Sequence, residues 1–250
     1  MPKFIRPKSL TELTTHYCPG CTHGIIHRLI AEVMDDMGIE DKTIGVCPVG
    51  CAVLAYKYYT CDFIQASHGR APAVATGAKR ATPDNLVFTY QGDGDLAAIG
   101  TAEIVHAATR GENITAIFVN NAIYGMTGGQ MAPTTLPGQK TQTTPRGRDT
   151  VNDGFPIRVC EMLSTLDGVA RAERVSVHDP KHVLAAKKAI RTAFDLQQKK
   201  AGFTIVEIVS NCPTNWGMTP IDSLTWLEEN LLPYYPLGVY ADKQVRGERK

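Results

Sequence analysis

The sequence has no long apolar run and no clear excess of charge of one sign. None of its hydrophobic stretches approaches the roughly 20 residues that a membrane-spanning helix requires. Residues 1–15 also lack the apolar core of a secretory signal peptide. Lysine and arginine number 26 against 25 aspartates and glutamates, which gives no electrostatic basis for binding nucleic acid or an anionic membrane. We therefore expect a cytoplasmic protein that contacts neither.

The length and composition suit one large α/β domain. With 250 residues, of which 43% are apolar, the chain can bury a sizeable core. The hydrophobic periodicity alternates between helix and strand, which predicts a mainly parallel sheet with helices on both faces. Helices are expected over residues 25–37, 71–82, 96–110, 156–166 and 180–200, and strands over 43–46, 86–90, 115–119, 168–172 and 203–209.

Two segments fall outside this alternation. Residues 122–153 are rich in Gly, Thr and Pro, and a loop of this length inside a domain is usually functional. Residues 211–250 carry several prolines with both tryptophans. We expect a cofactor-binding domain over 1–210, followed by an extended arm that packs on this domain or on a partner subunit. An irregular cap on the same domain is an equal alternative.

A pair of short motifs predicts a magnesium and diphosphate site. Gly92-Asp93-Gly94 and the adjacent Asp95 directly follow one predicted strand, and Asn120-Asn121 ends the next. In a parallel sheet, ligands bind where strands end and helices begin, because helix N-termini attract phosphate. Asp93, Asn121 and the main-chain carbonyl of Ile123 would supply three oxygens to Mg²⁺, with two phosphate oxygens and one water completing the octahedron.

Five of the seven cysteines lie in predicted turns. In a reducing compartment, clustered cysteines indicate metal ligands or reactive thiols rather than disulfides. Cys18 and Cys21 form a Cys-Pro-Gly-Cys pair, and the further candidates are Cys47, Cys51 and Cys212. Four thiolates from separate turns suit an iron–sulfur cluster, whereas the pair alone is equally compatible with zinc or a redox dithiol.

A third motif, Ser67-His68-Gly69-Arg70, precedes a predicted helix. His68 or Arg70 can neutralise a diphosphate or a substrate carboxylate. The alternative is a capping turn with a solvated arginine. We interpret four other residues as structural: His16, His23, Cys61 and Cys160.

The motifs together resemble those of 2-oxoacid:ferredoxin oxidoreductase β subunits. The segment from Gly92 to Asn121 resembles the thiamine diphosphate fingerprint, and Tyr124-Gly125-Met126-Thr127-Gly128-Gly129-Gln130 resembles the loop that follows it. The family also carries a Cys-Pro-Gly-Cys pair, a later Gly-Cys and a Cys-Pro-Thr near the end. The resemblance covers residues 17–213. It implies one [4Fe-4S] cluster on Cys18, Cys21, Cys51 and Cys212, with Cys47 competing for the third position, and cofactor contacts from Tyr124, Gly125, Thr127, His68 and Arg70.

The resemblance implies oxidative decarboxylation of a 2-oxoacid with coenzyme A and ferredoxin. The glutamate that activates the cofactor is implied to lie in a partner α subunit, so we expect an obligate hetero-oligomer, with γ and ferredoxin-like δ subunits as further partners. Some relatives that act on several 2-oxoacids carry a lysine where this chain has Leu54. This difference favours a branched-chain 2-oxoacid, with 2-oxoglutarate as the alternative. A non-redox thiamine diphosphate lyase with structural zinc, or a metal-binding module without enzymatic activity, are the rival hypotheses.

Overall fold

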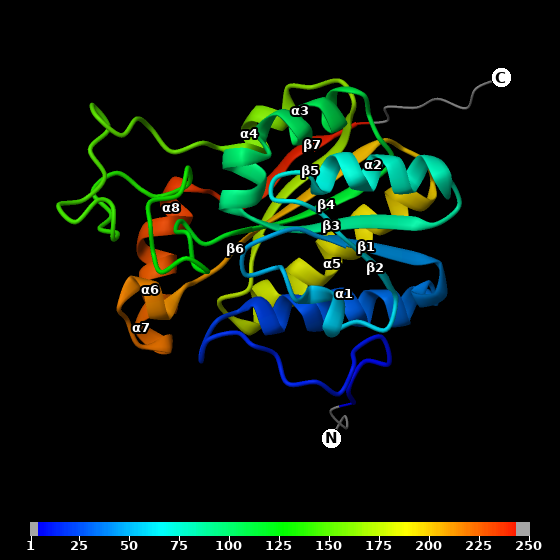
Figure 1. Cartoon of the computed structure of the whole chain (residues 1–250), viewed down its shortest axis with the longest axis horizontal. Helices are drawn as coiled ribbons and strands as arrows, with labels where there is room; N and C mark the ends of the chain where they lie inside the picture. Colours follow the sequence, from blue (N-terminus) through cyan, green and yellow to red (C-terminus); the bar gives the residue numbers. More distant parts are fainter. Residues whose placement is uncertain (1–4, 244–250) are drawn as a thin grey trace.

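The protein is built on one seven-stranded sheet with helices on both faces (Figure 1). The computed structural model describes residues 5–243. The strand order is β2-β1-β3-β4-β6-β5-β7. All neighbours pair in parallel except β5 and β7. The strands are β1 Thr43–Cys47, β2 Asp62–Gln65, β3 Leu86–Gly92, β4 Thr115–Asn120, β5 Val169–Ser176, β6 Phe203–Val209 and β7 Gly238–Asp242.

The central strands are covered on both sides, as their sequences require. Every residue of β4 and β6 is buried, which is the pattern of a parallel strand between two helical layers. The register pairs Gly92 with Val119 and Asn120 with Val209. The ends of β3, β4 and β6 therefore meet at one edge, where the two predicted motifs lie.

Two helical layers cover the sheet. Helices α1 and α5 lie on one face, and α2, α3 and α4 lie on the other (Figure 1). Helix α1 buries Ile26, Ile30 and Met34, which recur at helical spacing, and it ends at Gly38 in the left-handed conformation. The helices of these layers are α1 His23–Met37, α2 Ala71–Ala81, α3 Thr101–Thr109, α4 Val159–Ser164 and α5 Pro180–Gln198, with short turns η1 Glu40–Lys42 and η2 Ala55–Lys57.

The predicted helix over residues 96–110 is divided in two. A π-helical turn, η3 Asp95–Ile99, precedes α3, and Gly100 separates them. A Cβ atom at Gly100 would lie 2.4 Å from Asp95 O and 2.8 Å from Gly69 O, so only glycine permits this close approach. Helix α4 is shorter than predicted and β5 is longer. Strand β2 was not predicted, because it is a short edge strand with mostly exposed residues.

The C-terminal segment differs from the extended arm that the sequence suggested. It forms α6 Pro213–Trp216, α7 Pro220–Trp226, η4 Leu227–Leu231 and α8 Leu232–Tyr234, and then adds β7 to the sheet. A proline is the first residue of each of the helices α6 and α7, where its missing N–H costs nothing. Leu227, Leu231 and Tyr235 pack on Ala122 and Val209 of the main domain. The described part of this segment is thus a folded cap; residues 244–250 lie outside the described residues.

None of the helices between residues 5 and 243 has the length and apolar character needed to cross a membrane.

Candidate functional site

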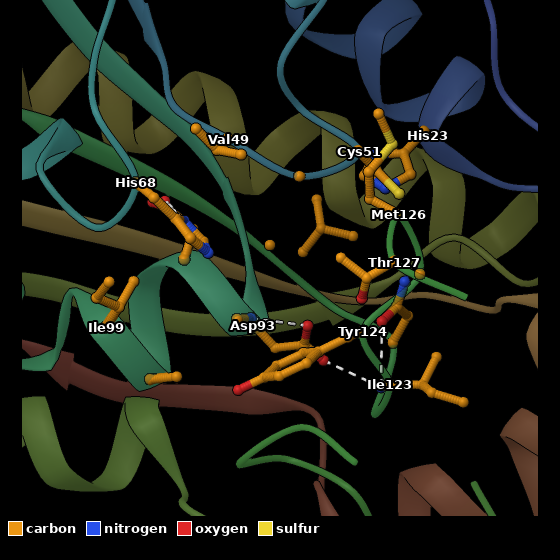
Figure 2. A pocket seen from close by; sticks show the side chains of 18 residues that line it. His23, Val49, Cys51, His68, Asp93, Ile99, Ile123, Tyr124, Met126 and Thr127 are labelled. Atoms are coloured by element: carbon orange, nitrogen blue, oxygen red, sulfur yellow. Dashed lines mark hydrogen bonds and ion pairs between the residues drawn. The ribbon is translucent and has the colours of Figure 1, made fainter. Parts of the chain in front are cut away.

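A cavity opens at the carboxyl edge of the sheet (Figure 2). Its walls come from the ends of β3 and β4, from η3, and from the turns that follow β1 and β2. In Figure 2, Asp93 and Tyr124 lie on one side of the cavity, and Cys51, His23 and Met126 lie at its other end. Ten of the predicted cofactor-binding residues line it, namely Gly92, Asp93, Gly94, Asp95, Asn121, Ile123, Tyr124, Gly125, Thr127 and His68.

Asp93 is a buried carboxylate held by donors on two sides. Its Oδ1 accepts from Gly94 N at 2.9 Å, and its Oδ2 accepts from Thr134 Oγ1 at 2.7 Å and from Ile123 N at 3.2 Å. Burial raises the pKa of Asp93 to about 7, although these hydrogen bonds oppose the rise. An ionised carboxylate in this position is stabilised by a cation.

Asn121 completes a group of three oxygens with Asp93 and Ile123. The terminal amide atom of Asn121 that occupies the Oδ1 position lies 2.7 Å from Ile123 O and 3.3 Å from Asp93 Oδ2. With the amide oxygen in that place, three oxygens converge, and the Ile123 N–H is the donor shared by the Asp93 and Asn121 oxygens. A hard divalent cation stabilises such a group of oxygens. With the amide turned, its nitrogen donates to both oxygens instead. The donor set therefore fits Mg²⁺, and the amide can serve both states.

Glycines keep the diphosphate side of the cavity open. A Cβ atom at Gly94 would lie 2.9 Å from Tyr124 Cε1, so the ring of Tyr124 rests directly on this glycine. At Gly92 an added Cβ would meet nothing within 4 Å. The absence of side chains at Gly92 and Gly94 lets a ligand and the Tyr124 ring approach the backbone closely.

The His68 turn is fixed by Asp95. The Asp95 carboxylate accepts from His68 Nδ1 and Gly69 N, both at 2.6 Å, and from Gln91 Nε2 at 2.6 Å. Asp95 lines the cavity, but its oxygens are occupied in positioning His68 there. Arg70 is not among the lining residues and instead pairs with Glu103 of α3. The structure thus brings His68 to the site but not Arg70.

Four cysteines line an adjoining cavity. They are Cys18, Cys21, Cys51 and Cys212, the set that the family resemblance implied. A Cβ atom added at Gly125 would lie 3.1 Å from Cys51 Sγ and 3.6 Å from Cys212 Sγ, so both sulfurs lie beside this glycine. The two cavities share Cys51, Asn121 and Gly125, together with His23 and Met126. The diphosphate site and the cysteine site are therefore contiguous.

The Cys-Pro-Gly-Cys turn is docked on the C-terminal cap. Gly20 has a left-handed φ of 78°, and a Cβ there would lie 2.4 Å from Pro220 Cβ. Asn211 Nδ2 donates to Gly20 O at 3.1 Å. Two segments far apart in the sequence, one around residue 20 and one around residues 211–220, thus meet at the cysteine cavity and bring Cys18 and Cys21 close to Cys212.

The remaining cysteines point elsewhere. Cys47 is fully buried in the hydrophobic core beneath α1, with its Sγ 3.8 Å from Val53 O. Cys61 belongs to the same core, and Cys160 to the core on the opposite face. Cys51 therefore lines the cysteine cavity and Cys47 does not, which favours Cys51 for the third ligand position, for which the sequence offered both.

Burial raises the pKa of three of the four cavity thiols, those of Cys21, Cys51 and Cys212. Burial raises the pKa of Cys21 to about 11 and that of Cys51 to about 12, and the neighbouring cysteines raise both further. Thiols in this state become thiolates only when a metal centre stabilises the charge. A metal centre is therefore the role that their chemistry fits.

The two histidines interpreted as structural are hydrogen-bonded to tyrosines. His23 is 2% exposed, its Nδ1 lies 2.5 Å from Tyr90 OH, and burial lowers its pKa to about 3. His16 Nδ1 lies 2.6 Å from Tyr58 OH. Sequence reasoning did not foresee that His23 lines both cavities. It also missed Thr134, which carries no motif and reaches Asp93 only through the fold of the long loop.

Comparisons with known proteins agree with this geometry. Residues 48–208 match the family model of the thiamine pyrophosphate enzyme C-terminal TPP binding domain. The fold and the site thus define a thiamine diphosphate-binding class of protein.

Two curated relatives and one solved structure narrow the class. The chain is 46% identical to ketoisovalerate oxidoreductase subunit VorA of Methanothermobacter thermautotrophicus over 98% of this chain and 51% of that one. It is 38% identical to 2-oxoglutarate synthase subunit KorB of Archaeoglobus fulgidus over 87% of this chain and 77% of that one. The structure of 2-oxoglutarate:ferredoxin oxidoreductase from Magnetococcus marinus, with 2-oxoglutarate, coenzyme A and succinyl-CoA bound, superposes with a TM-score of 0.82 at 28% identity, covering 96% of this chain and 85% of that one.

The chain belongs to the family of 2-oxoacid:ferredoxin oxidoreductase subunits. It spans about half the length of the VorA relatives that it matches.

Proposed function

We propose that this chain is the β subunit of a cytoplasmic 2-oxoacid:ferredoxin oxidoreductase and holds thiamine diphosphate, Mg²⁺ and one [4Fe-4S] cluster. The reaction would convert a 2-oxoacid, coenzyme A and oxidised ferredoxin into an acyl-CoA, CO₂ and reduced ferredoxin. The observation that carries the proposal is the shared wall of the two cavities, formed by Cys51, Asn121 and Gly125. Electron transfer from one cofactor to the other requires such proximity.

The residues of the chain would act mainly by positioning. Asp93, Asn121 and the Ile123 carbonyl would hold Mg²⁺, while the amides that follow Gly92 would bind the diphosphate. Bound thiamine diphosphate supplies a carbon nucleophile for the 2-oxo group and a ring that accepts the electron pair left by CO₂, and a bound cluster accepts electrons singly. Gly125 would separate the two groups by backbone alone, because it carries no side chain.

The spacing of the cysteines favours a cluster over zinc. Tetrahedral zinc with Zn–S bonds of about 2.3 Å brings its sulfurs to about 3.8 Å from one another. Within the described part of the chain, the group with three metal-type ligand atoms within 4.8 Å of one another is His178, Asp179 and His182, and the cysteines form no group this tight. A cubane cluster holds thiolates farther apart, because each binds a different iron.

The composition of the cavity supports a partner subunit. Among the described residues that line the diphosphate cavity there is no glutamate to activate the cofactor. We propose that an α subunit supplies this glutamate and that γ and ferredoxin-like δ subunits complete the complex. The isolated chain should then be inactive.

The lining also favours an apolar substrate. Val49, Ile99 and Met126 line the cavity and are exposed by 43, 50 and 52%, and no lysine or arginine is among the described lining residues. A second carboxylate, as in 2-oxoglutarate, would find no lysine or arginine among the described lining residues, and the Nδ1 of the lining residue His68 is already bonded to Asp95. We therefore propose a branched-chain 2-oxoacid such as 2-oxoisovalerate, in keeping with the name of the VorA relative, a ketoisovalerate oxidoreductase subunit.

The test is an assay of the purified complex. A panel of 2-oxoacids is supplied with coenzyme A and a low-potential acceptor, and each product is identified. The proposal expects branched-chain 2-oxoacids to be turned over fastest; faster turnover of 2-oxoglutarate would contradict the substrate assignment. Cys212→Ser should abolish acceptor reduction. Turnover that survives this change would instead indicate a non-redox lyase.

A further inference from the structure

A row of buried polar side chains connects the magnesium site to the C-terminal cap. It crosses four neighbouring strands, from Asn120 on β4 through Glu207 on β6 and Arg174 on β5 to Tyr240 on β7 (Figure 1). Asn120, Glu207 and Arg174 are each 0% exposed. None of these residues touches the cavity itself, so the proposed chemistry does not account for them.

Asn120 holds the turn that aims the metal ligands. Its Oδ1 accepts from Ala122 N at 3.3 Å, and its Nδ2 donates to Glu207 Oε1 at 2.8 Å. Ala122 has a φ of 57°, the left-handed conformation that is strained for a non-glycine residue. This residue lies between Asn121 and Ile123, two of the three oxygen donors. The strained turn must therefore be fixed by its surroundings if those oxygens are to converge.

Glu207 supplies the acceptor that orients Asn120. Without a carboxylate at this position, the Asn120 amide has no fixed direction, and its oxygen can leave Ala122 N. A buried carboxylate is stable only when it is paired and hydrogen-bonded. Its second oxygen, Oε2, accepts from Arg174 Nη2 at 3.0 Å and from Cys160 N at 3.4 Å.

Arg174 is in turn held by Glu161 of α4, which accepts from both of its terminal nitrogens, and by the cap. Its Nη1 donates to Tyr240 OH at 2.6 Å, to Pro236 O at 3.2 Å and to Glu161 Oε1 at 3.0 Å. Tyr240 OH also donates to Pro236 O at 2.6 Å. The ring of Tyr240 lies 4.8 Å from the guanidinium carbon, within the range of a cation–π contact. The antiparallel strand β7 thus closes over the only cation that faces Glu207 in this row.

We propose that Asn120, Glu207, Arg174 and Tyr240 form a positioning relay by which the C-terminal cap sets the geometry of the magnesium site. The inference rests on the proposed function, because it assigns the relay to a bound Mg²⁺ and diphosphate. In metal sites, residues that orient the ligands typically alter metal affinity by about 10–100-fold when they are changed. The relay would carry this influence on metal affinity from β4, across β6 and β5, to β7.

The test measures metal binding and not turnover. Mn²⁺ replaces Mg²⁺ in the purified complex with thiamine diphosphate, and free Mn²⁺ is followed by its EPR signal. Glu207→Gln replaces one of the two acceptor oxygens by an NH₂ group, so either Asn120 Nδ2, or Arg174 Nη2 together with Cys160 N, loses its acceptor. We expect Mn²⁺ to bind about 10–100-fold more weakly in this variant. Tyr240→Phe removes one hydroxyl from Arg174 and should give a smaller but measurable weakening.

Glu173→Gln is the matched control. Glu173 lies on β5, beside Arg174 in the sequence. Like Glu207 it pairs with an arginine, since its Oε2 lies 2.8 Å from Arg171 Nη2, but it does not contact the relay. Its Mn²⁺ affinity should equal that of the wild type. The melting temperature of each cofactor-free variant is measured in parallel, so that a loss of stability is not taken for a loss of affinity.

The outcomes separate the two proposals. A wild-type complex that fails to bind Mn²⁺ with thiamine diphosphate contradicts the proposed function, and with it the relay. Wild-type binding together with unchanged affinity in Glu207→Gln and Tyr240→Phe overturns the relay alone and leaves a purely structural network. If Glu207→Gln does not fold, Tyr240→Phe decides the question, because its side chain lies at the edge strand.

Discussion

Gly125→Ala adds one methyl group between the two proposed cofactors. The backbone at Gly125 lies outside the left-handed region, so alanine meets no conformational penalty there. The new Cβ would lie 3.1 Å from Cys51 Sγ, 3.6 Å from Cys212 Sγ and 3.8 Å from Asn215 Nδ2. Because van der Waals contact requires about 3.5–4.0 Å, Cys51 must move by roughly half an ångström.

This movement should disturb the cluster more than the fold. Overpacking of this kind costs about 1–3 kcal/mol, which corresponds to about 2–10 °C in the melting temperature of a chain of this size. The assay is iron per chain after anaerobic purification, together with thiamine diphosphate binding. We expect iron content to fall well below that of the wild type.

Gly77→Ala is the control for this change. Gly77 lies on the exposed side of α2, and an added Cβ would meet nothing within 4 Å. This variant should keep its iron and gain about 0.5–1 kcal/mol of stability from helix propensity. If Gly125→Ala retained full iron and melted like the wild type, the cysteines would not converge beside Gly125 as described.

Three further predictions concern the metal ligands and the buried core. Asp93→Asn should weaken Mg²⁺ binding at least about tenfold. In the cofactor-free protein the removal of a buried charge is offset by the lost hydrogen bond where the new NH₂ group faces a donor, so its melting temperature should stay close to that of the wild type; titration calorimetry and melting curves check both. Cys51→Ser should remove the cluster's visible absorbance and Cys47→Ser should not, since Cys47 faces the core; equal loss in both would contradict the assignment. Burial holds the pKa of His27 well below 6.5, so only the unfolded state gains this proton as the pH falls below about 6.5. Stability should therefore decline by about 1.4 kcal/mol per pH unit from this residue, and His27→Gln should flatten the denaturation profile.

The cofactor motifs were predictable because they are local. Gly92-Asp93-Gly94 and Asn120-Asn121 each follow a strongly apolar strand, and parallel strands bring their carboxyl ends to one edge. The long loop after residue 122 was likewise evident from its composition. These features depend on neighbouring residues alone.

Contacts made across the fold were not predictable in the same way. Thr134 reaches Asp93, and Glu207 reaches Asn120, only through the course of a loop and the register of two strands. Arg70 belongs to the same motif as His68, but its side chain pairs with Glu103 on α3. This contact depends on how α3 packs, which the local sequence does not indicate. The C-terminal helices were missed because their prolines, which favour a helix's first turn, also favour extended chain.

We propose that one chain holds a thiamine diphosphate site and an iron–sulfur cluster in contact with each other. The most direct measurement is to add 2-oxoisovalerate and coenzyme A, without ferredoxin, to the anaerobically purified complex and to follow the visible absorbance of the cluster. The account predicts about four iron atoms in this chain and bleaching that depends on the 2-oxoacid and is lost in Cys212→Ser. Stoichiometric zinc in place of iron, or a cluster that the 2-oxoacid does not reduce, would contradict it.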